Sequence, residues 1–158
     1  MPTDLGPGSK APRFKLPHDG GEPLTLADFK DKNLVIFFFP KADTPGCTKE
    51  SIAFSRLRGA FAKADTEVIG VSADTAPKQS AFRKKHDIKI PLGADETRKM
   101  IEDYGAWGEK SLYGRKFMGI IRMTYLIGKD GRIVKIWPKV RVEGHAEDVL
   151  KAAQEVSA

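Results

Sequence analysis

The stretch NLVIFFFP, residues 33–40, restricts the fold of this chain more than any other segment. Its apolar side chains follow one another without the alternation of a half-buried strand. Such a run is typical of a strand covered on both faces, as in a parallel sheet. It is too short to cross a bilayer. We expect Pro40 to end the strand, because proline cannot donate to a strand ladder.

Alternating helical and strand patterns follow this stretch. Helical spacing from Cys47 to Ala64 places Phe54, Leu57 and Phe61 on one stripe with Ala64. Further strands are expected at 66–73 and 89–95, and further helices at 76–87, 96–105 and 144–158. Residues 106–119 are expected to form a loop, and β-rich runs on both sides of GKDG, within 120–138, predict a hairpin.

The segment before residue 33 is expected to form an arm. PRFKLP, at 12–17, alternates like an edge strand, HDGGEP, at 18–23, is typical of a turn, and order resumes at 24–32. Strands that alternate with helices predict an α/β fold. We therefore expect a mixed central sheet flanked by helices, with an N-terminal strand or hairpin extension. The length of 158 residues suits a single domain over 1–158.

Composition excludes several classes of protein. Hydrophobic residues make up 41% and charged residues 30%, as in ordinary globular proteins. The net charge of +6 comes from basic residues spread along the chain, without the motif or stacking aromatics of a nucleic-acid binder. The first residues, MPTDLGPGSKAPRF, contain no apolar signal region. With one cysteine and no possible internal disulfide, a cytoplasmic location is expected.

The usual signatures of cofactor and metal sites are absent from the sequence. There is no GxGxxG, no GxxxxGK[ST] and no GxSxG, and the three histidines, His18, His86 and His145, match no zinc spacing. Glu50 stands where a CxxC motif would have its second cysteine. We therefore expect neither a cofactor nor a metal ion.

Cys47, the only cysteine, is the remaining candidate for chemistry. A lone cysteine is often a buried and inert small hydrophobe. This one, however, follows a central strand and lies in the first turn of an expected helix, where free N–H groups and the helix dipole favour a thiolate anion. Asp43, Thr44 and Pro45 suit the cap and first turn, and Gly46 allows close approach of a small ligand. A reactive thiolate is the favoured interpretation.

Two separated motifs resemble the peroxiredoxins, in particular the Q type, also called bacterioferritin comigratory proteins. PKADTPGCTKE is similar to the family's active-site loop, Pro-x-x-x-Thr-x-x-Cys, with Pro40, Thr44 and Cys47 at its fixed positions. YGAWGEKSLYGRKFMGIIRMTYLIGKDGRI, at 104–133, is similar to a second Q-type segment. The resemblance runs from about residue 8 to the last helix. It implies a thioredoxin-like fold and a thiol-dependent peroxidase that reduces hydrogen peroxide and organic hydroperoxides without a cofactor.

The resemblance also implies roles for individual residues. Cys47 would attack the peroxide and become a sulfenic acid, and Thr44 would hydrogen-bond the thiolate and the peroxide. Arg122 would hold the thiolate and the leaving oxygen, and Pro40 would shield the pocket from water. Backbone N–H groups near Gly46 would face the developing negative charge. Glu50, one turn after Cys47, would orient Arg122.

The sequence departs from many Q-type proteins in lacking a second, resolving cysteine. Ile52 stands five residues after Cys47, and the other usual position lies around His86. The expected mechanism therefore uses one cysteine and an external thiol, from thioredoxin, glutaredoxin or glutathione. Monomer and homodimer both suit this architecture. The alternative function is a non-enzymatic redox sensor or holdase that uses Cys47 oxidation.

Overall fold

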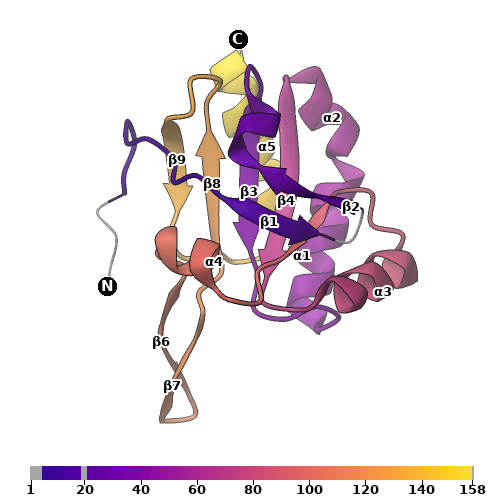
Figure 1. Ribbon diagram of the computed structural model, residues 1–158, viewed down its shortest axis with the longest axis vertical. Helices are drawn as coiled ribbons and strands as arrows, with labels where there is room; N and C mark the ends of the chain where they lie inside the picture. Colours follow the sequence, from indigo (N-terminus) through magenta and orange to yellow (C-terminus); the bar gives the residue numbers. More distant parts are fainter. Residues whose placement is uncertain (1–4, 19–20, 158) are drawn as a thin grey trace.

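The computed structural model describes residues 5–18 and 21–157, and its main feature is a seven-stranded mixed sheet (Figure 1). The strand order is β2-β1-β5-β4-β3-β8-β9. The strands are β1 (Lys15–His18), β2 (Gly21–Thr25), β3 (Asn33–Phe38), β4 (Thr66–Ser72), β5 (Leu92–Ala94), β8 (Met123–Ile127) and β9 (Ile133–Trp137). Strands β3, β4 and β5 run parallel, whereas β8 is antiparallel to β3 and β9 is antiparallel to β8.

Strand β3 separates two hydrophobic cores, as its continuous apolar sequence predicts. Because successive side chains of a strand point to opposite faces, Leu34, Ile36 and Phe38 belong to one core and Val35 and Phe37 to the other. All six residues of β3 are buried. The strand therefore ends at a fixed point inside the molecule, from which the next loop starts.

Helices cover both faces of the sheet. The core of Val35 and Phe37 also holds apolar side chains of α1 (Pro45–Arg56), α2 (Arg58–Lys63), α3 (Ala76–His86) and α5 (His145–Ser157). The short helix α4 (Lys99–Asp103) packs in the other core, in front of the sheet in Figure 1. The expected continuous helix from Cys47 to Ala64 is wrong, because the helix ends at Arg56 and α2 begins after Leu57.

Residues 106–119 do not form the expected loop. They build a second sheet of two antiparallel strands, β6 (Trp107–Leu112) and β7 (Arg115–Ile120), which projects from the body (Figure 1). Tyr113 and Gly114 make the turn, and both have positive φ, as a two-residue hairpin turn requires. The two strands lack a clear alternation of apolar and polar residues, because most of their side chains are exposed or only half-buried. The sequence therefore carries no strand signal here.

The N-terminal arm forms the expected extension, with one difference. Strand β1 is not an edge strand, because it lies between β2 and β5, and β2 takes the edge. Of the expected turn at 18–23, residues 19–20 lie outside the described residues, and Gly21, Glu22 and Pro23 belong to β2. A short 3-10 helix, Leu26–Phe29, links β2 to β3. No helix in the described part of the chain is long and apolar enough to cross a membrane.

Candidate active site

Cys47 lies at the carboxyl end of β3, in the first turn of α1, and is buried. The first N–H groups of a helix have no acceptor within it, and the side chain of Thr44, the N-cap residue, caps none of them. These groups and the helix dipole therefore favour a negative charge at this end of α1. In open α/β sheets, ligands bind at such carboxyl ends of the strands.

Arg122 meets Cys47 from the far side of the sequence. It stands between β7 and β8, and its Nη2 donates a hydrogen bond to Sγ of Cys47 at 3.4 Å. Burial works against the charge of Arg122, but Glu50 and then Cys47 outweigh it and raise the pKa of the guanidinium. Arg122 therefore stays positive beside the sulfur.

Gly46 makes this approach possible. A Cβ atom on Gly46 would lie 3.3 Å from Nη2 of Arg122, closer than ordinary van der Waals contact. A larger residue would push the guanidinium away from the helix end. The glycine thus has a steric role beside Cys47.

Glu50 holds the other side of the guanidinium. Its Oε1 accepts from Nη1 of Arg122 at 2.6 Å, and the carboxyl group is almost fully buried. Burial raises the pKa of Glu50 to about 7, against the opposing charge of Arg122. Within the described residues, Oε2 has no hydrogen-bond partner. Glu50 therefore fixes Arg122 but is only partly compensated for its burial.

Thr44 does not make the hydrogen bond to Cys47 that its expected role requires, and the shielding role of Pro40 is untested. The hydroxyl of Thr44 donates to the carbonyl of Lys41 at 2.8 Å, and no hydrogen bond joins it to Cys47 among the residues that the structure covers. Pro40 follows β3 and is half-buried. A hydroxyl has one hydrogen to donate, so Thr44 must rotate before it can bond a thiolate or a peroxide. The roles of both residues stay predictions.

The loop from Lys41 to Thr44 is fastened at two points. Oδ2 of Asp74 accepts from the backbone N–H of Ala42 at 2.8 Å. Asp43, with a φ of 62°, contacts Lys85 and His86 of α3, each at 2.8 Å. Hydrogen bonds with these two side chains lower the pKa of the Asp43 carboxyl, Lys85 more than His86. Helix α3 thereby reaches the loop that carries Cys47.

Two further residues near the site were not found from the sequence. Nζ of Lys110, on β6, donates to the carbonyl of Ile120 at 2.8 Å, just before Arg122. Burial lowers the pKa of Lys110, Arg122 lowers it further, and the Cys47 charge raises it, so its ammonium lies within electrostatic reach of both groups. The residue fell in the segment expected to be a loop, and no local signal marks it.

His145 is the second. At the start of α5, its Nε2 is 2.8 Å from Oγ1 of Thr124. Burial lowers the pKa of His145 to about 4, so the ring is neutral near pH 7. His145 therefore adds no positive charge to those of Arg122 and Lys110.

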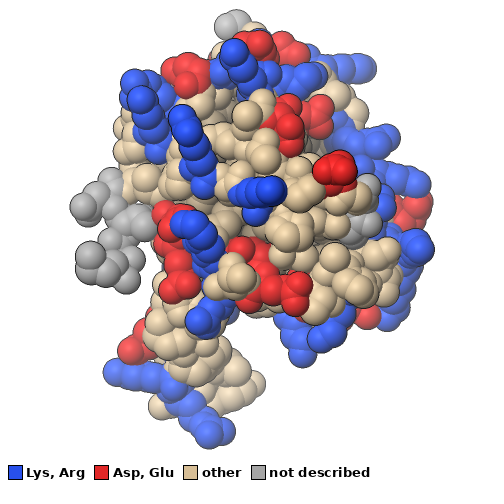
Figure 2. Space-filling model, viewed as in Figure 1, with Lys and Arg blue, Asp and Glu red and all other residues tan. Residues whose placement is uncertain are grey.

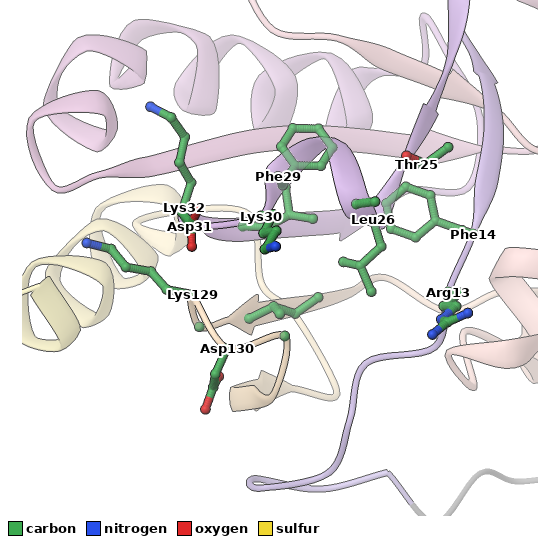
Figure 3. A pocket seen from close by; sticks show the side chains of 15 residues that line it. Arg13, Phe14, Thr25, Leu26, Phe29, Lys30, Asp31, Lys32, Lys129 and Asp130 are labelled. Atoms are coloured by element: carbon green, nitrogen blue, oxygen red, sulfur yellow. The ribbon is translucent and has the colours of Figure 1, made fainter.

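Hollows in the surface lie on both ends of the sheet. One, of about 620 Å³, opens beside the first turn of α1 and is lined by Pro45, Gly46, Lys49 and the segment 142–144. Another, of about 640 Å³, is lined by Leu34 at the start of β3 and Ile127 at the end of β8, and so lies at the other end of β3 from the loop that carries Cys47. Figure 3 shows the side chains that line it. The second hollow therefore belongs to no chemistry described above. In the described part of the chain, no group of His, Cys, Asp or Glu side chains could hold a metal ion.

Known proteins are similar to this chain in sequence and in fold. The model of the AhpC/TSA family matches residues 7–136. Peroxiredoxin Bcp of Bacillus subtilis is 40% identical over 150 residues, which cover 95% of this chain and 96% of that protein. A mutant of PrxQ from Xylella fastidiosa superposes with a TM-score of 0.92 at 31% identity, over 99% of both chains.

A further solved structure, the bacterioferritin comigratory protein of Xanthomonas campestris, was determined to study its alkyl peroxide reduction activity. It has a TM-score of 0.87 at 35% identity and covers 92% of both chains. These similarities confirm the expected thioredoxin-like fold. Together with the placement of Cys47 and Arg122, they lead to one assignment: the chain belongs to the AhpC/TSA family, among its Bcp and Q-type peroxiredoxins, and is a thiol-dependent peroxidase.

Proposed function

We propose that Cys47 is the peroxidatic residue and that Arg122 assists it directly. The sulfur attacks one peroxide oxygen, the O–O bond breaks, and the other oxygen leaves as hydroxide or alkoxide, which takes up a proton. Cys47 is left as a sulfenic acid. The hydrogen bond from Arg122 Nη2 to Sγ is the observation that carries this proposal, because the same guanidinium can also face the leaving oxygen.

The remaining site residues support these two. Glu50 orients Arg122 through its ion pair at 2.6 Å, and Gly46 leaves room for the guanidinium. Thr44 turns its hydroxyl from Lys41 toward the peroxide when substrate is bound. Pro40 limits the access of water to the sulfur. The backbone N–H groups at Gly46 and Cys47 face the charge that develops on the oxygens.

Hydrogen peroxide and organic hydroperoxides are the proposed substrates. The hollow beside Pro45 and Gly46 supports the larger ones, since its volume of about 620 Å³ admits an alkyl chain. The activity studied in the Xanthomonas campestris relative is of the same class. The reaction itself needs only a thiolate and a peroxide.

An external thiol completes the proposed cycle. Neither Ile52, which packs against the core of α1, nor His86, which binds Asp43, can form a disulfide with Cys47. The donor is thioredoxin, glutaredoxin or glutathione. We further propose that residues 1–158 act as one domain, in the cytoplasm, as a monomer or a homodimer.

Stopped-flow oxidation of the reduced protein by hydrogen peroxide tests the proposal. Cys47→Ser abolishes the reaction, and Arg122→Ala slows the loss of the thiol by about a hundredfold or more, as when an oxyanion donor is removed. Arg56→Ala, an exposed arginine on the same helix, is the matched control and keeps the wild-type rate. A wild-type thiol that reacts no faster than free cysteine would refute the proposed roles.

A further inference from the structure

The hairpin of β6 and β7 carries most of the large hydrophobic side chains that are exposed in the described residues. Its large hydrophobic side chains are open to solvent: Tyr113 by 96%, Leu112 by 57%, Met118 by 55% and Phe117 by 46%. Elsewhere in the described residues, only Val134 and Val156 are comparable, at 37% and 39%. Leu112 and Phe117 lie on one face of the hairpin, Met118 lies on the other, and Tyr113 is in the turn. Exposed apolar side chains gathered on one small element mark an interaction site, and an isolated two-stranded hairpin is marginal in water. Both facts point to a partner.

The hairpin connects directly to the active site. Lys110 lies opposite Phe117 in the ladder, so the two side chains share a face, and Leu112 is two residues further along that face. The same Lys110 bonds the carbonyl of Ile120 and lies within electrostatic reach of Cys47. A molecule seated on Phe117 and Leu112 would therefore contact the hairpin face that carries Lys110, and the base of the same hairpin leads directly to Arg122.

The charges of the hairpin indicate the chemistry of the partner. Residues 107–120 carry three basic residues and one acidic residue, and Glu109 is paired with Lys116. No ion pair engages Arg115 within the described residues. Figure 2 shows the hairpin as largely uncharged with basic groups at its end. A partner with an apolar surface and an acidic rim complements it. A second copy of this chain, itself at +6, does not.

We propose that the hairpin is the docking arm for an acidic protein dithiol, the reductant of the Cys47 sulfenic acid. This inference rests on the proposed function, which requires an external thiol. One partner thiol forms an S–S bond with Cys47 while the S–O bond breaks, and the hydroxyl leaves as water with the proton of that thiol. The second partner thiol then attacks the partner's own sulfur. The electron pair returns to Cys47 as thiolate, and the partner keeps the disulfide.

Steady-state peroxidase assays with two kinds of electron donor test the docking arm. The protein donors are thioredoxin with its reductase and glutaredoxin with glutathione, and the small donor is dithiothreitol. The variant is Leu112→Thr/Tyr113→Asn/Phe117→Thr, because threonine suits strands and asparagine tolerates the positive φ of the turn. Val134→Thr, an exposed apolar residue on β9, is the matched control.

The triple variant should raise the KM for the protein donor about tenfold, as expected from the loss of interface anchors. Turnover with dithiothreitol and the stopped-flow oxidation by peroxide should stay at the wild-type level, as should all reactions of Val134→Thr. Arg115→Glu should also raise the KM for the protein donor, whereas Lys151→Glu on α5 should not.

Several results would overturn the docking arm. These are an unchanged KM, an equal loss with both kinds of donor, and no turnover with either protein donor. Sedimentation that shows a wild-type dimer and a monomeric triple variant would assign the hairpin to a second copy instead. Failure of the proposed function is a separate result, since slow oxidation of the wild type by peroxide is measured without any reductant.

Discussion

The charge balance around the sulfur of Cys47 depends on three side chains. Arg122 contacts the sulfur directly, Lys110 acts through space, and Glu50 pairs with Arg122 from inside the protein. When Glu50 is ionised, its carboxylate competes with the thiolate of Cys47 for the positive charge of Arg122. Glu50 therefore has two opposed effects, since it positions the guanidinium and also neutralises part of it.

Glu50 should make stability depend on pH. Burial raises the pKa of Glu50 from 4.5 to about 7 on folding. The native state therefore holds the proton more tightly, so the stabilisation is complete below 4.5 and is lost as the pH rises through about 7. Glu50→Gln cannot ionise. Relative to wild type, its free energy of unfolding in urea should rise across this window, by on the order of 3 kcal/mol at most.

The matching control is Glu67→Gln, a half-exposed glutamate on β4. It should leave the pH profile of wild type unchanged in this window. His145 contributes the opposite slope over an overlapping range, because burial lowers its pKa from 6.5 to about 4 on folding, but it does so equally in all these variants. A difference between Glu50→Gln and wild type that stays constant with pH would contradict the assignment.

Lys110 should matter through its charge. Lys110→Met removes one positive charge near Cys47 and the bond to the carbonyl of Ile120. Peroxide oxidation should slow about fivefold, as expected from the loss of about 1 kcal/mol of electrostatic stabilisation. Lys110→Arg keeps the charge and should recover most of the rate. Equal rates for the two variants would show that the charge has no role. Lys116→Met, on the other strand, serves as the control.

Among the elements, the loop between β3 and α1 is held more firmly by Asp74 than by Asp43. Asp74 accepts from Ala42 N–H and from the hydroxyl of Ser72 in a partly buried position. Asp43 uses an exposed ion pair with Lys85 and an exposed hydrogen bond with His86, which water and salt weaken. We therefore expect the Asp74 contact to stabilise the loop more than the Asp43 contacts do.

Asp74→Ala should reduce the free energy of unfolding by about 1–3 kcal/mol, because it leaves the Ala42 N–H without its partner. Asp43→Asn, which tolerates the positive φ, should stay close to wild type in the same urea titration. Hydrogen exchange of residues 42–47 should quicken only in the Asp74 variant. The opposite order would mean that helix α3, through Asp43, controls the loop.

The same elements show what the sequence could predict. Strand β3 and the β8–β9 hairpin were predicted because their apolar runs and the GKDG turn carry strong local signals. The β6–β7 hairpin was missed, since its exposed strands mix polar and apolar residues and its Tyr113–Gly114 turn lacks the common asparagine. The break at Leu57 was missed because Phe54 and Phe61 keep one stripe across it.

In the active site, too, the features that depend on nearby residues were predicted from local patterns, and the long-range contacts were not. The strand, the loop and the helix start near Cys47 are local, so they predicted its position. The partnership with Arg122 spans 75 residues and was expected only from the family resemblance. Lys110 and the Asp74 contact had no signal at all, because a long-range polar contact depends on the fold as a whole. Tyr113 and Phe117, in the segment expected to be a loop, are exposed on the β6–β7 hairpin.

At the scale of the whole molecule, the absence of a second cysteine should keep the oxidised protein folded. Cys47 and Ile52 are both in α1, five residues apart. A rise of about 1.5 Å per residue puts their Cα atoms more than 7 Å apart, beyond the reach of a disulfide. Relatives with a cysteine at the position of Ile52 must therefore open the helix, whereas this chain has no such need.

Hydrogen exchange on the reduced and peroxide-treated protein measures this difference. In wild type, the protection of residues 47–60 should be nearly the same in both states, since a sulfenic acid adds one oxygen and forms no crosslink. In Ile52→Cys, oxidation should remove the protection of α1, because the disulfide can close only after the first turns unwind. Ile52→Ser provides the control, being small and polar but unable to crosslink. Loss of protection in oxidised wild type would mean that this active site opens without a resolving cysteine, and an external thiol would then meet an unfolded helix.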